Sequence, residues 1–406
     1  MILPEFTLRI GLIPGALLCA EAVASAAMVI PLVRLLRRRI ASAETPDDTA
    51  DGTAPEKWPS LAVVAFASCM PDELDEFAAS LEAQEYPGSY TVVIVYDASA
   101  EAMKEMTETF AQRHPGVHLT FIPPGSHNLS RVKLANTIGI KAAEEAEVIL
   151  TTTSDSRPQS AQWTRLMAAP FINPDIELSL GTTEYPFSGM GLRGWYREFD
   201  SLLRTSAWIS SARTDLATRG CGENLAFRRS LFFPHKGYAG SIDLHRGEDD
   251  IFVADVATAD NCAVLESPES RTFTYLAPDP NRRWIKLKAE RLFTASYIRR
   301  HSSRAASVSS LFAWLTVALG IAAGITGWPN LTVAAAALGI LTIGACIIIG
   351  FYRSCASAVG ARRLWWGVVP YLMWRPIGTA IFRMRTRRFR SRNFTSTWVR
   401  PYHGGA

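Results

Sequence analysis

Three apolar runs, each long enough to cross a lipid bilayer as a helix, limit most strongly what this sequence can fold into. They cover about residues 11–33, 308–328 and 331–352. At 1.5 Å per residue, about 20 apolar residues span the hydrocarbon core of a bilayer. The sequence therefore predicts one membrane-spanning helix near the N-terminus and two near the C-terminus. Trp328, Pro329 and Asn330 separate the last two runs and predict a tight turn, so these two helices should form a hairpin.

Arginine residues predict how these helices are oriented. Arg34, Arg37, Arg38 and Arg39 directly follow the first run, and further arginines flank the hairpin on both outer sides. The positive-inside rule places these flanks in the cytoplasm and the N-terminus on the other side. Because the charge follows the first run, we expect an uncleaved anchor, with a cleaved signal peptide as the alternative. Glu21 lies within this run and is a functional candidate by default, although contact with other helices or with water is the simpler interpretation.

A fourth apolar stretch, about residues 364–382, contains Pro370, Arg375 and Pro376. If this stretch crossed the membrane, the six arginines within residues 383–392 would lie on the non-cytoplasmic side. We therefore expect an interfacial or re-entrant helix, and a fourth span is the alternative.

The net charge of +4 conceals an uneven distribution. Residues 291–406 contain fifteen arginines and no lysine or carboxylate, so the preceding residues carry a surplus of acid. These arginines are interleaved with apolar runs and aromatic residues, which makes anionic membrane lipid the expected partner. For the same reason we expect no nucleic-acid partner.

The order of these features predicts six segments. They are an N-terminal transmembrane anchor (1–40), a polar linker (41–57), an α/β domain (58–282), an amphipathic interfacial segment (283–305), a transmembrane hairpin (306–352) and a basic interfacial or re-entrant tail (353–406). The six cysteines form no CxxC pair, which argues against a zinc site and fits a reducing cytoplasm.

Residues 58–300 alternate between strand and helix patterns. Apolar runs at 61–67, 90–96, 117–122 and 148–152 predict buried strands, and helical periodicity predicts helices at 73–84, 100–113 and 131–146. This alternation predicts an α/β fold with a mostly parallel sheet. Ligands of such sheets bind beyond the carboxyl ends of the strands, where Asp97 and Asp155 each follow a predicted strand.

Seven short motifs follow one another between residues 81 and 291. They are Leu81–Pro87 (LEAQEYP), Val95–Ser99 (VYDAS), Lys133–Asn136 (KLAN), Thr153–Asp155 (TSD), Gly220–Arg229 (GCGENLAFRR), Gly247–Asp250 (GEDD) and Trp284–Arg291 (WIKLKAER). In this order they resemble the motifs of membrane-anchored family 2 glycosyltransferases. The resemblance implies a GT-A fold, which is Rossmann-like, and a nucleotide-sugar donor carrying UDP or GDP. Three departures are Thr153 for the first Asp of the DxD motif, Tyr96 for the first Asp of the uridine motif, and the lack of a Gln in the last motif.

The resemblance assigns roles on the donor side. Glycosyl transfer needs stabilisation of the leaving diphosphate, typically by Mg²⁺ or Mn²⁺ with oxygen ligands. Asp155 would contact the metal, Asp97 would bind the base and ribose of the nucleotide, and Lys133 would lie near the diphosphate. The structural alternatives are a helix N-cap for Asp155, an Asx turn with Ser99 for Asp97, and a solvated helix position for Lys133.

The GEDD motif places Glu248, Asp249 and Asp250 in a row at a predicted helix start. Clustered like charges raise one pKa, which suits a general base, whereas the helix dipole acts in the opposite direction. The resemblance assigns the base to Asp249, with Asp250 as second choice, and implies inversion at the anomeric carbon. Ordinary acidity of a first helical turn is the alternative.

Two further groups complete the predicted site. Asn224 and Arg228 would line the acceptor side, or would only pack their loop. Trp284, Lys288 and Arg291 would contact the donor from an amphipathic segment, although simple membrane adhesion explains their charges nearly as well.

The layout of anchor, catalytic body and short terminal bundle is similar to that of ceramide glucosyltransferases. Cellulose and hyaluronan synthases resemble it more distantly, because they have more spans. We therefore expect transfer to a lipid or lipid-linked acceptor by an integral protein of the inner or plasma membrane. The alternatives are a subunit of a processive polysaccharide synthase and a catalytically degenerate membrane scaffold.

Overall fold

The structure is a computed structural model of the chain, and it separates into two compact units. A helical unit contains Met1–Glu44, Phe187–Ser210 and Ser303–Arg385, and a sheet unit contains Thr45–Pro186, Ser211–Ser302 and Thr386–Ala406. The described residues are 6, 9–44, 57–67, 71–97, 109–123, 129–185, 191–214, 216–244, 246–274, 280–295, 297–298 and 304–386.

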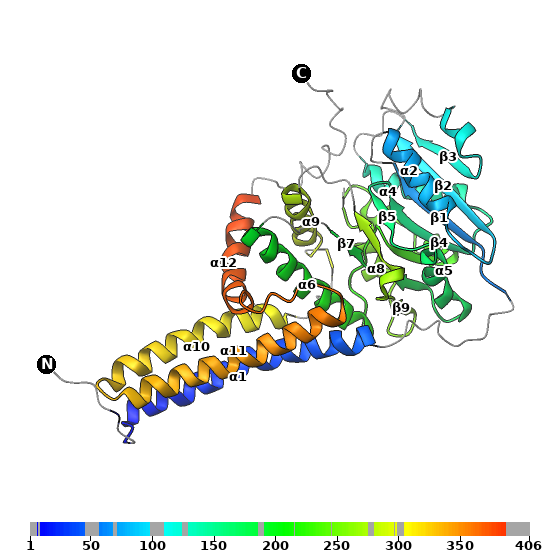
Figure 1. Cartoon of the computed structure of the whole chain (residues 1–406). Coiled ribbons are helices and arrows are strands. Elements are labelled where there is room, and N and C mark those ends of the chain that lie inside the picture. Colours follow the sequence, from blue (N-terminus) through cyan, green and yellow to red (C-terminus); the bar gives the residue numbers. More distant parts are fainter. Residues whose placement is uncertain are drawn as a thin grey trace. The chain divides into compact units, whose positions relative to one another are not determined.

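A seven-stranded sheet forms the centre of the sheet unit (Figure 1). Its strands are β1 (Leu61–Phe66), β2 (Tyr90–Asp97), β3 (Val117–Ile122), β4 (Val148–Thr153), β6 (Leu178–Leu180), β8 (Leu225–Arg228) and β9 (Cys262–Val264). Their order is β3-β2-β1-β4-β8-β6-β9, with β3, β2, β1 and β4 parallel and β8 antiparallel to both of its neighbours. All six residues of β1 are buried, as expected for a strand covered on both faces. The predicted mostly parallel α/β sheet is confirmed.

Helices cover this sheet, and a smaller sheet lies beside it. The helices of the unit are α2 (Pro71–Glu82), α4 (Arg131–Ala142), α5 (Trp163–Ala168), α7 (Arg229–Phe232), α8 (Asp250–Val256) and α9 (Pro280–Thr294), with 3-10 turns at Ala169–Ile172, Ala239–Ser241 and Pro268–Ser270. The smaller sheet joins β5 (Ser156–Pro158), β10 (Thr272–Thr274) and β7 (Thr183–Glu184). Most of the predicted helix at 100–113 lies outside the described residues. Its last five residues, 109–113, are described and are helical.

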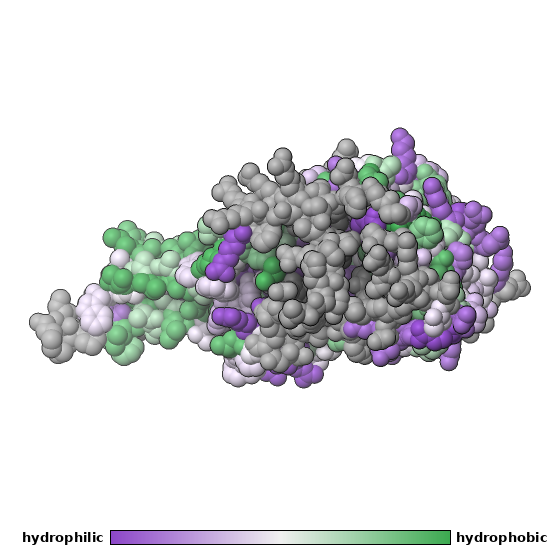
Figure 2. Space-filling view, turned by 90° about the horizontal axis from the view of Figure 1, so that it is seen from above, coloured by the Kyte–Doolittle hydropathy of each residue, from purple (hydrophilic) through white to green (hydrophobic). Residues whose placement is uncertain are grey.

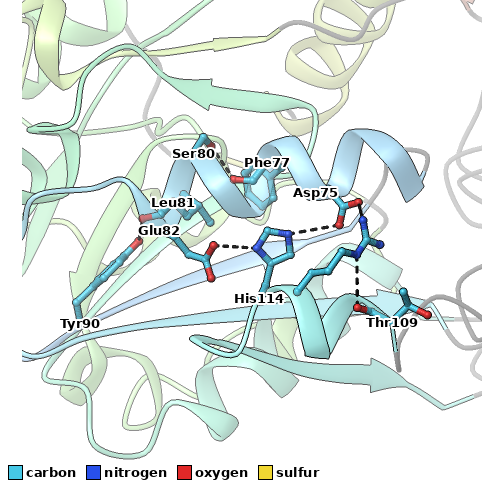
Figure 3. A network of polar contacts seen from close by, with 9 residues as sticks. Asp75, Phe77, Ser80, Leu81, Glu82, Tyr90, Thr109 and His114 are labelled. Carbon is cyan, nitrogen blue, oxygen red and sulfur yellow. Dashed lines mark hydrogen bonds and ion pairs between the residues drawn. The ribbon is translucent and has the colours of Figure 1, made fainter.

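A polar network joins α2 to the turn that precedes β3 (Figure 3). The ring of His114 lies between two carboxylates of α2, with Nδ1 2.8 Å from Glu82 Oε2 and Nε2 3.4 Å from Asp75 Oδ1. Arg113 also pairs with Asp75. Because these partners come from both sides of the ring, the network fixes α2 against the edge of the sheet at β3.

The helical unit contains α1 (Leu12–Glu44), α10 (Ala305–Gly327), α11 (Leu331–Ala358), α12 (Val368–Thr386) and most of α6 (Gly191–Thr214). In Figure 1, α1, α10 and α11 run side by side, and each of the last two helices contacts α1. Among the described residues, the segments long and apolar enough to cross a membrane are Leu12–Ala41, Ala305–Gly327 and Leu331–Ala358. Figure 2 shows that hydrophobic residues dominate the visible surface of this bundle. The prediction of one N-terminal and two C-terminal membrane helices is confirmed.

Two details explain how the bundle packs. Asn330 caps α11, because its side chain accepts a hydrogen bond from the Thr332 amide at 3.0 Å, which ends the hairpin turn as predicted. Glu21 is 1% exposed and faces Gly320 of α10, where an added Cβ would come within 2.7 Å of Glu21 Oε1. The intramembrane carboxylate therefore points at a neighbouring helix, as the simpler interpretation of the sequence expects.

The fourth apolar stretch contains α12, which packs on α6 through a buried ion pair. Arg375 Nε lies 3.2 Å from Asp200 Oδ1, and Arg204 Nη2 lies 3.2 Å from Asp200 Oδ2. Arg375 also donates to Ser307 Oγ of α10 at 3.3 Å. The charge within this stretch is therefore compensated by protein groups, while its interfacial placement stays a prediction.

The packing of α4 on the sheet gives a stability prediction. Gly139 lies so close to β1 that an added Cβ would be 2.4 Å from Val64 Cγ1 and 3.1 Å from Val95 Cγ2. We expect Gly139→Ala to lower the free energy of unfolding by about 1–3 kcal/mol through overpacking, even though alanine favours helix. Thermal and chemical unfolding of the detergent-purified protein would measure this loss.

Gly240→Ala is the matched control, because nothing lies within 4 Å of the Cβ position of Gly240. Equal stability of the two variants would contradict the packing described for α4.

Candidate active site

A cleft of about 870 Å³, including its open mouth, lies at the carboxyl ends of β1 and β4. Its floor includes Phe66, the last residue of β1, and Thr152 and Thr153 at the end of β4. The segments 221–223 and 246–250 and one face of α9 form the walls. This is the edge at which α/β sheets bind their ligands.

Asp155 lies in this cleft, directly after β4. Thr153 Oγ1 donates a hydrogen bond to Asp155 Oδ1 at 2.5 Å, so the residue at the first DxD position holds the remaining carboxylate. Ser156–Pro158 continue as strand β5 and not as a helix, so the alternative role of Asp155 as a helix N-cap is wrong.

The GEDD motif forms the opposite wall, and α8 begins within it as predicted. Asp249 is the N-cap: Oδ1 accepts from the Asp250 amide at 2.6 Å, and Oδ2 accepts from the Gly222 amide at 3.2 Å. Burial, followed by the charges of Asp250 and Glu248, raises the pKa of Asp249 well above its usual range. A raised carboxylate pKa beside a cleft is the property of a general base that works near neutral pH.

The two neighbours of Asp249 differ in their surroundings. Asp250 pairs with Arg219 and accepts a hydrogen bond from Thr294 Oγ1 at 2.8 Å. Burial raises the pKa of Glu248, while the charge of Arg246 acts in the opposite direction. Asp250 is paired with a cation, whereas the hydrogen bonds to Asp249 come from neutral backbone amides, so Asp249 is the better placed of the two aspartates to accept a proton from a ligand.

Basic side chains face the same cleft. Lys286 and Arg291 line it from α9, and Arg246 lines it from the segment before GEDD. Lys288 Nζ instead lies 4.6 Å from the centre of the Trp284 ring. Neither Lys288 nor Trp284 lines the cleft. Of the three predicted donor contacts on this segment, the structure therefore brings only Arg291 to the cleft and adds Lys286.

Asp97 and Lys133 lie near the cleft but do not line it. Asp97, the last residue of β2, forms a buried ion pair with Arg131, whose Nε donates to Oδ2 at 2.8 Å. Lys133 is 0% exposed, and its Nζ donates to the carbonyl and hydroxyl oxygens of Ser241 at 2.6 and 2.9 Å. The alternative of a solvated helix lysine is therefore wrong, and contacts of both residues with the donor stay predictions.

Burial lowers the pKa of Lys133 to about 8, against the opposing charges of Glu248 and Asp249. The coupling is reciprocal, so a charged Lys133 favours the ionised form of the carboxylates in GEDD.

Asn224 and Arg228, predicted on the acceptor side, do not line the cleft either. Asn224 is fully buried: Oδ1 accepts from Trp163 Nε1 at 2.9 Å, and Nδ2 donates to two backbone carbonyls. Arg228 pairs in register with Val148 at the start of β4, while the cleft lies at the end of that strand. Its guanidinium donates to the carbonyls of Phe171, Asn173 and Ile176. Both residues make the packing contacts that the sequence left as an alternative, and their acceptor-side role stays a prediction.

Several cleft residues were missed from the sequence: Tyr185, Glu223, Arg246 and Lys286. The α9 residues that line the cleft lie on one helix face (286, 287, 290, 291 and 294), but only the orientation of α9 shows that this face meets the cleft, so no local signal marks Lys286. Tyr185 and Arg246 stand in no motif, and only the tertiary fold brings them to the cleft.

The described residues include no group of three or more His, Cys, Asp or Glu side chains that could hold a metal ion by themselves. Magnesium-type ions are usually bound through one or two carboxylates together with phosphate oxygens of the substrate. Asp155, with the hydroxyl of Thr153 beside it, fits this kind of partial donor set.

Comparison with solved structures confirms the predicted GT-A fold. A mannosyltransferase from Pyrobaculum calidifontis, in complex with GDP-Man and Mn²⁺, has a TM-score of 0.56 and 17% identity over 92% of this chain and 99% of its own. A match of that extent includes much of the helical unit as well as the sheet. The similarity to S. aureus TarS is weaker, with a TM-score of 0.39 and 15% identity over 82% of this chain and 55% of that chain. No protein-family model matches the sequence, and no curated protein does so either.

The hydrogen bonds of Asn224 give a second prediction. Asn224→Ala would remove the hydrogen bonds that Asn224 makes with the Trp163 indole and the Ser270 carbonyl, and the Thr182 carbonyl would keep only its bond from the Thr272 amide. Each buried group that loses its partner costs about 1–3 kcal/mol. We expect a large loss of stability in denaturant unfolding. A stable Asn224→Ala variant with altered acceptor selectivity would instead support the acceptor-side role.

Proposed function

We propose that the protein transfers a sugar from a UDP- or GDP-sugar to a lipid or lipid-linked acceptor at the cytoplasmic face of the membrane. The observation that carries the proposal is the cleft, which brings Asp155, Asp249 and Arg291 together at the ligand-binding edge of a GT-A sheet. The GDP-Man and Mn²⁺ bound by the similar mannosyltransferase support a nucleotide-sugar donor.

The basic side chains of the cleft support a diphosphate ligand. Arg246, Lys286 and Arg291 line it, and cations of this kind stabilise the charge that develops on a leaving diphosphate. Asp155 would hold Mg²⁺ or Mn²⁺, which supplies further positive charge at the diphosphate when bound. Asp97 and Lys133, behind the cleft, would support the nucleotide end of the donor.

Asp249 is the proposed general base. Its carboxylate accepts the proton of the acceptor hydroxyl as that oxygen forms a bond to the anomeric carbon. The bond from this carbon to the diphosphate breaks in the same displacement, so the configuration inverts. The raised pKa of Asp249 supports this role, because proton transfer is most effective when the base titrates near the working pH.

The helices that could span a membrane support a membrane-borne acceptor. The three helices of the described residues that could span a membrane are few for enclosing a polysaccharide channel, which favours a lipid acceptor over a processive synthase subunit. The hydrogen bond between Thr153 and Asp155 keeps a carboxylate in the cleft despite the altered DxD motif, which counts against a degenerate scaffold.

Radiolabelled transfer tests this function. Purified membranes would receive a panel of UDP- and GDP-sugars with and without Mn²⁺, and product would be separated into lipid-extractable and polymeric fractions. We expect lipid-extractable label, reduced about 10²–10⁴-fold by Asp249→Asn because general-base catalysis is lost.

Asp255→Asn is the control for that experiment, because it removes an exposed carboxylate from the same helix. Transfer that survives Asp249→Asn would show that Asp249 is not the base. Label in the polymeric fraction would favour the processive polysaccharide synthase subunit. No transfer from any donor would favour the catalytically degenerate scaffold.

Lys133 gives a prediction for the pH dependence. The base must be deprotonated, so activity should fall as pH drops through the pKa of Asp249. Lys133→Met removes a positive charge that favours the ionised carboxylates, so the acid limb of the kcat/KM profile should move to higher pH.

Lys141→Met is the matched control, because Lys141 is exposed on the same helix. An acid limb that stays in place in Lys133→Met, or moves equally in both variants, would show that Lys133 does not influence the base.

A further inference from the structure

One wall of the cleft is a single helix face. Lys286, Leu287, Glu290, Arg291 and Thr294 of α9 line the cleft. Their spacing of three to four residues places them on the same side of the helix. The position of α9 therefore determines where its two cations stand in the cleft.

The C-terminal end of α9 is tied to the start of α8 through Asp250. Thr294 Oγ1 donates to Asp250 Oδ2 at 2.8 Å, and Arg219 pairs with the same carboxylate. Arg219 Nη2 also donates to the Arg291 carbonyl at 3.2 Å. Asp250 is 4% exposed, so these charge-assisted hydrogen bonds lie where water screens them least.

A second tie holds the same helix from the GEDD side. Arg246 Nη2 lies 2.5 Å from Glu290 Oε1, and both side chains are largely buried. Arg246 immediately precedes the glycine that opens GEDD. Both ties thus join α9 to the segment that carries Asp249.

We propose that Asp250 is a positioning residue and not the base: through Arg219 and Thr294 it holds α9 so that Lys286 and Arg291 face the donor diphosphate. The identity of the donor rests on the proposed function, whereas the tie itself does not. The carboxylate of Asp250 accepts a hydrogen bond from Thr294 of α9, whereas the carboxylate of Asp249 accepts hydrogen bonds from the amides of Asp250 and Gly222. The two aspartates therefore have separate roles in one motif.

Loss of the tie should weaken donor capture and leave the base intact. Asp250→Asn keeps the side-chain shape and removes the charge that Arg219 needs. Because a misplaced catalytic wall costs up to about 10²-fold, we expect kcat/KM to fall about 10- to 100-fold, mainly through a higher KM for the nucleotide sugar. The acid limb of the pH profile should move to lower pH, because Asp250 no longer raises the pKa of Asp249.

Limited trypsin digestion of the purified full-length protein measures the tie without any substrate. Lys286, Lys288 and Arg291 are trypsin sites within α9, and cleavage at each can be followed by mass spectrometry. We expect these sites to be cut about tenfold faster or more in Asp250→Asn and Thr294→Val, because each variant loses a charge-assisted hydrogen bond to α9. Thr294→Ser retains the hydroxyl and should behave as wild type.

Asp255→Asn is again the matched control, and the melting temperature of each variant separates local opening of α9 from global unfolding. Unchanged cleavage of α9 in both Asp250→Asn and Thr294→Val would overturn the tie. The proposal would also be overturned if Asp250→Asn lowered kcat and left KM unchanged while Thr294→Val changed neither constant. That result would make Asp250 the base. Absence of transfer from every donor would instead count against the proposed function, and the cleavage result would still stand.

Discussion

Carboxylates are concentrated in a cleft at the carboxyl ends of the central strands, and the burial of their charge is the constraint on which the surrounding structure depends. Asp250 is compensated by Arg219, and Glu290 by Arg246, while the buried Lys133 acts on Glu248 and Asp249 from behind the cleft. The compensation is incomplete at Asp249, whose pKa stays raised. Perturbed groups of this kind gather at functional sites, because the same burial that costs stability prepares a group for proton transfer.

Much of the fold follows from local patterns in the sequence. The apolar run of β1 and the helical periodicity of α4 can each be recognised within a few neighbouring residues. The same holds for the membrane helices and for the hairpin turn at Asn330. Asp155 could be predicted because it follows a strand end, and the GEDD carboxylates because they stand at a helix start; the choice of Asp249 among them is what the resemblance to glycosyltransferase motifs implies. Topology then brings these two ends to one edge of the sheet.

The remaining site residues depend on contacts between distant segments. Nothing local distinguishes Lys286, which lines the cleft, from Lys288, which contacts Trp284; only the orientation of α9 does so. Asn224 stands in a segment that resembles a glycosyltransferase motif, yet its amide forms hydrogen bonds with Trp163 and two backbone carbonyls beneath the surface. Burial of a polar side chain is decided by tertiary partners, which a single sequence does not reveal.

Equilibrium binding of radiolabelled UDP- and GDP-sugars to the purified protein, with and without Mn²⁺, tests the central claim most directly. The account predicts that one nucleotide sugar binds in a Mn²⁺-dependent manner and that Asp155→Asn abolishes this dependence. Binding that is indifferent to both Mn²⁺ and Asp155, or no binding of any nucleotide sugar, would contradict the account of the cleft as a donor site.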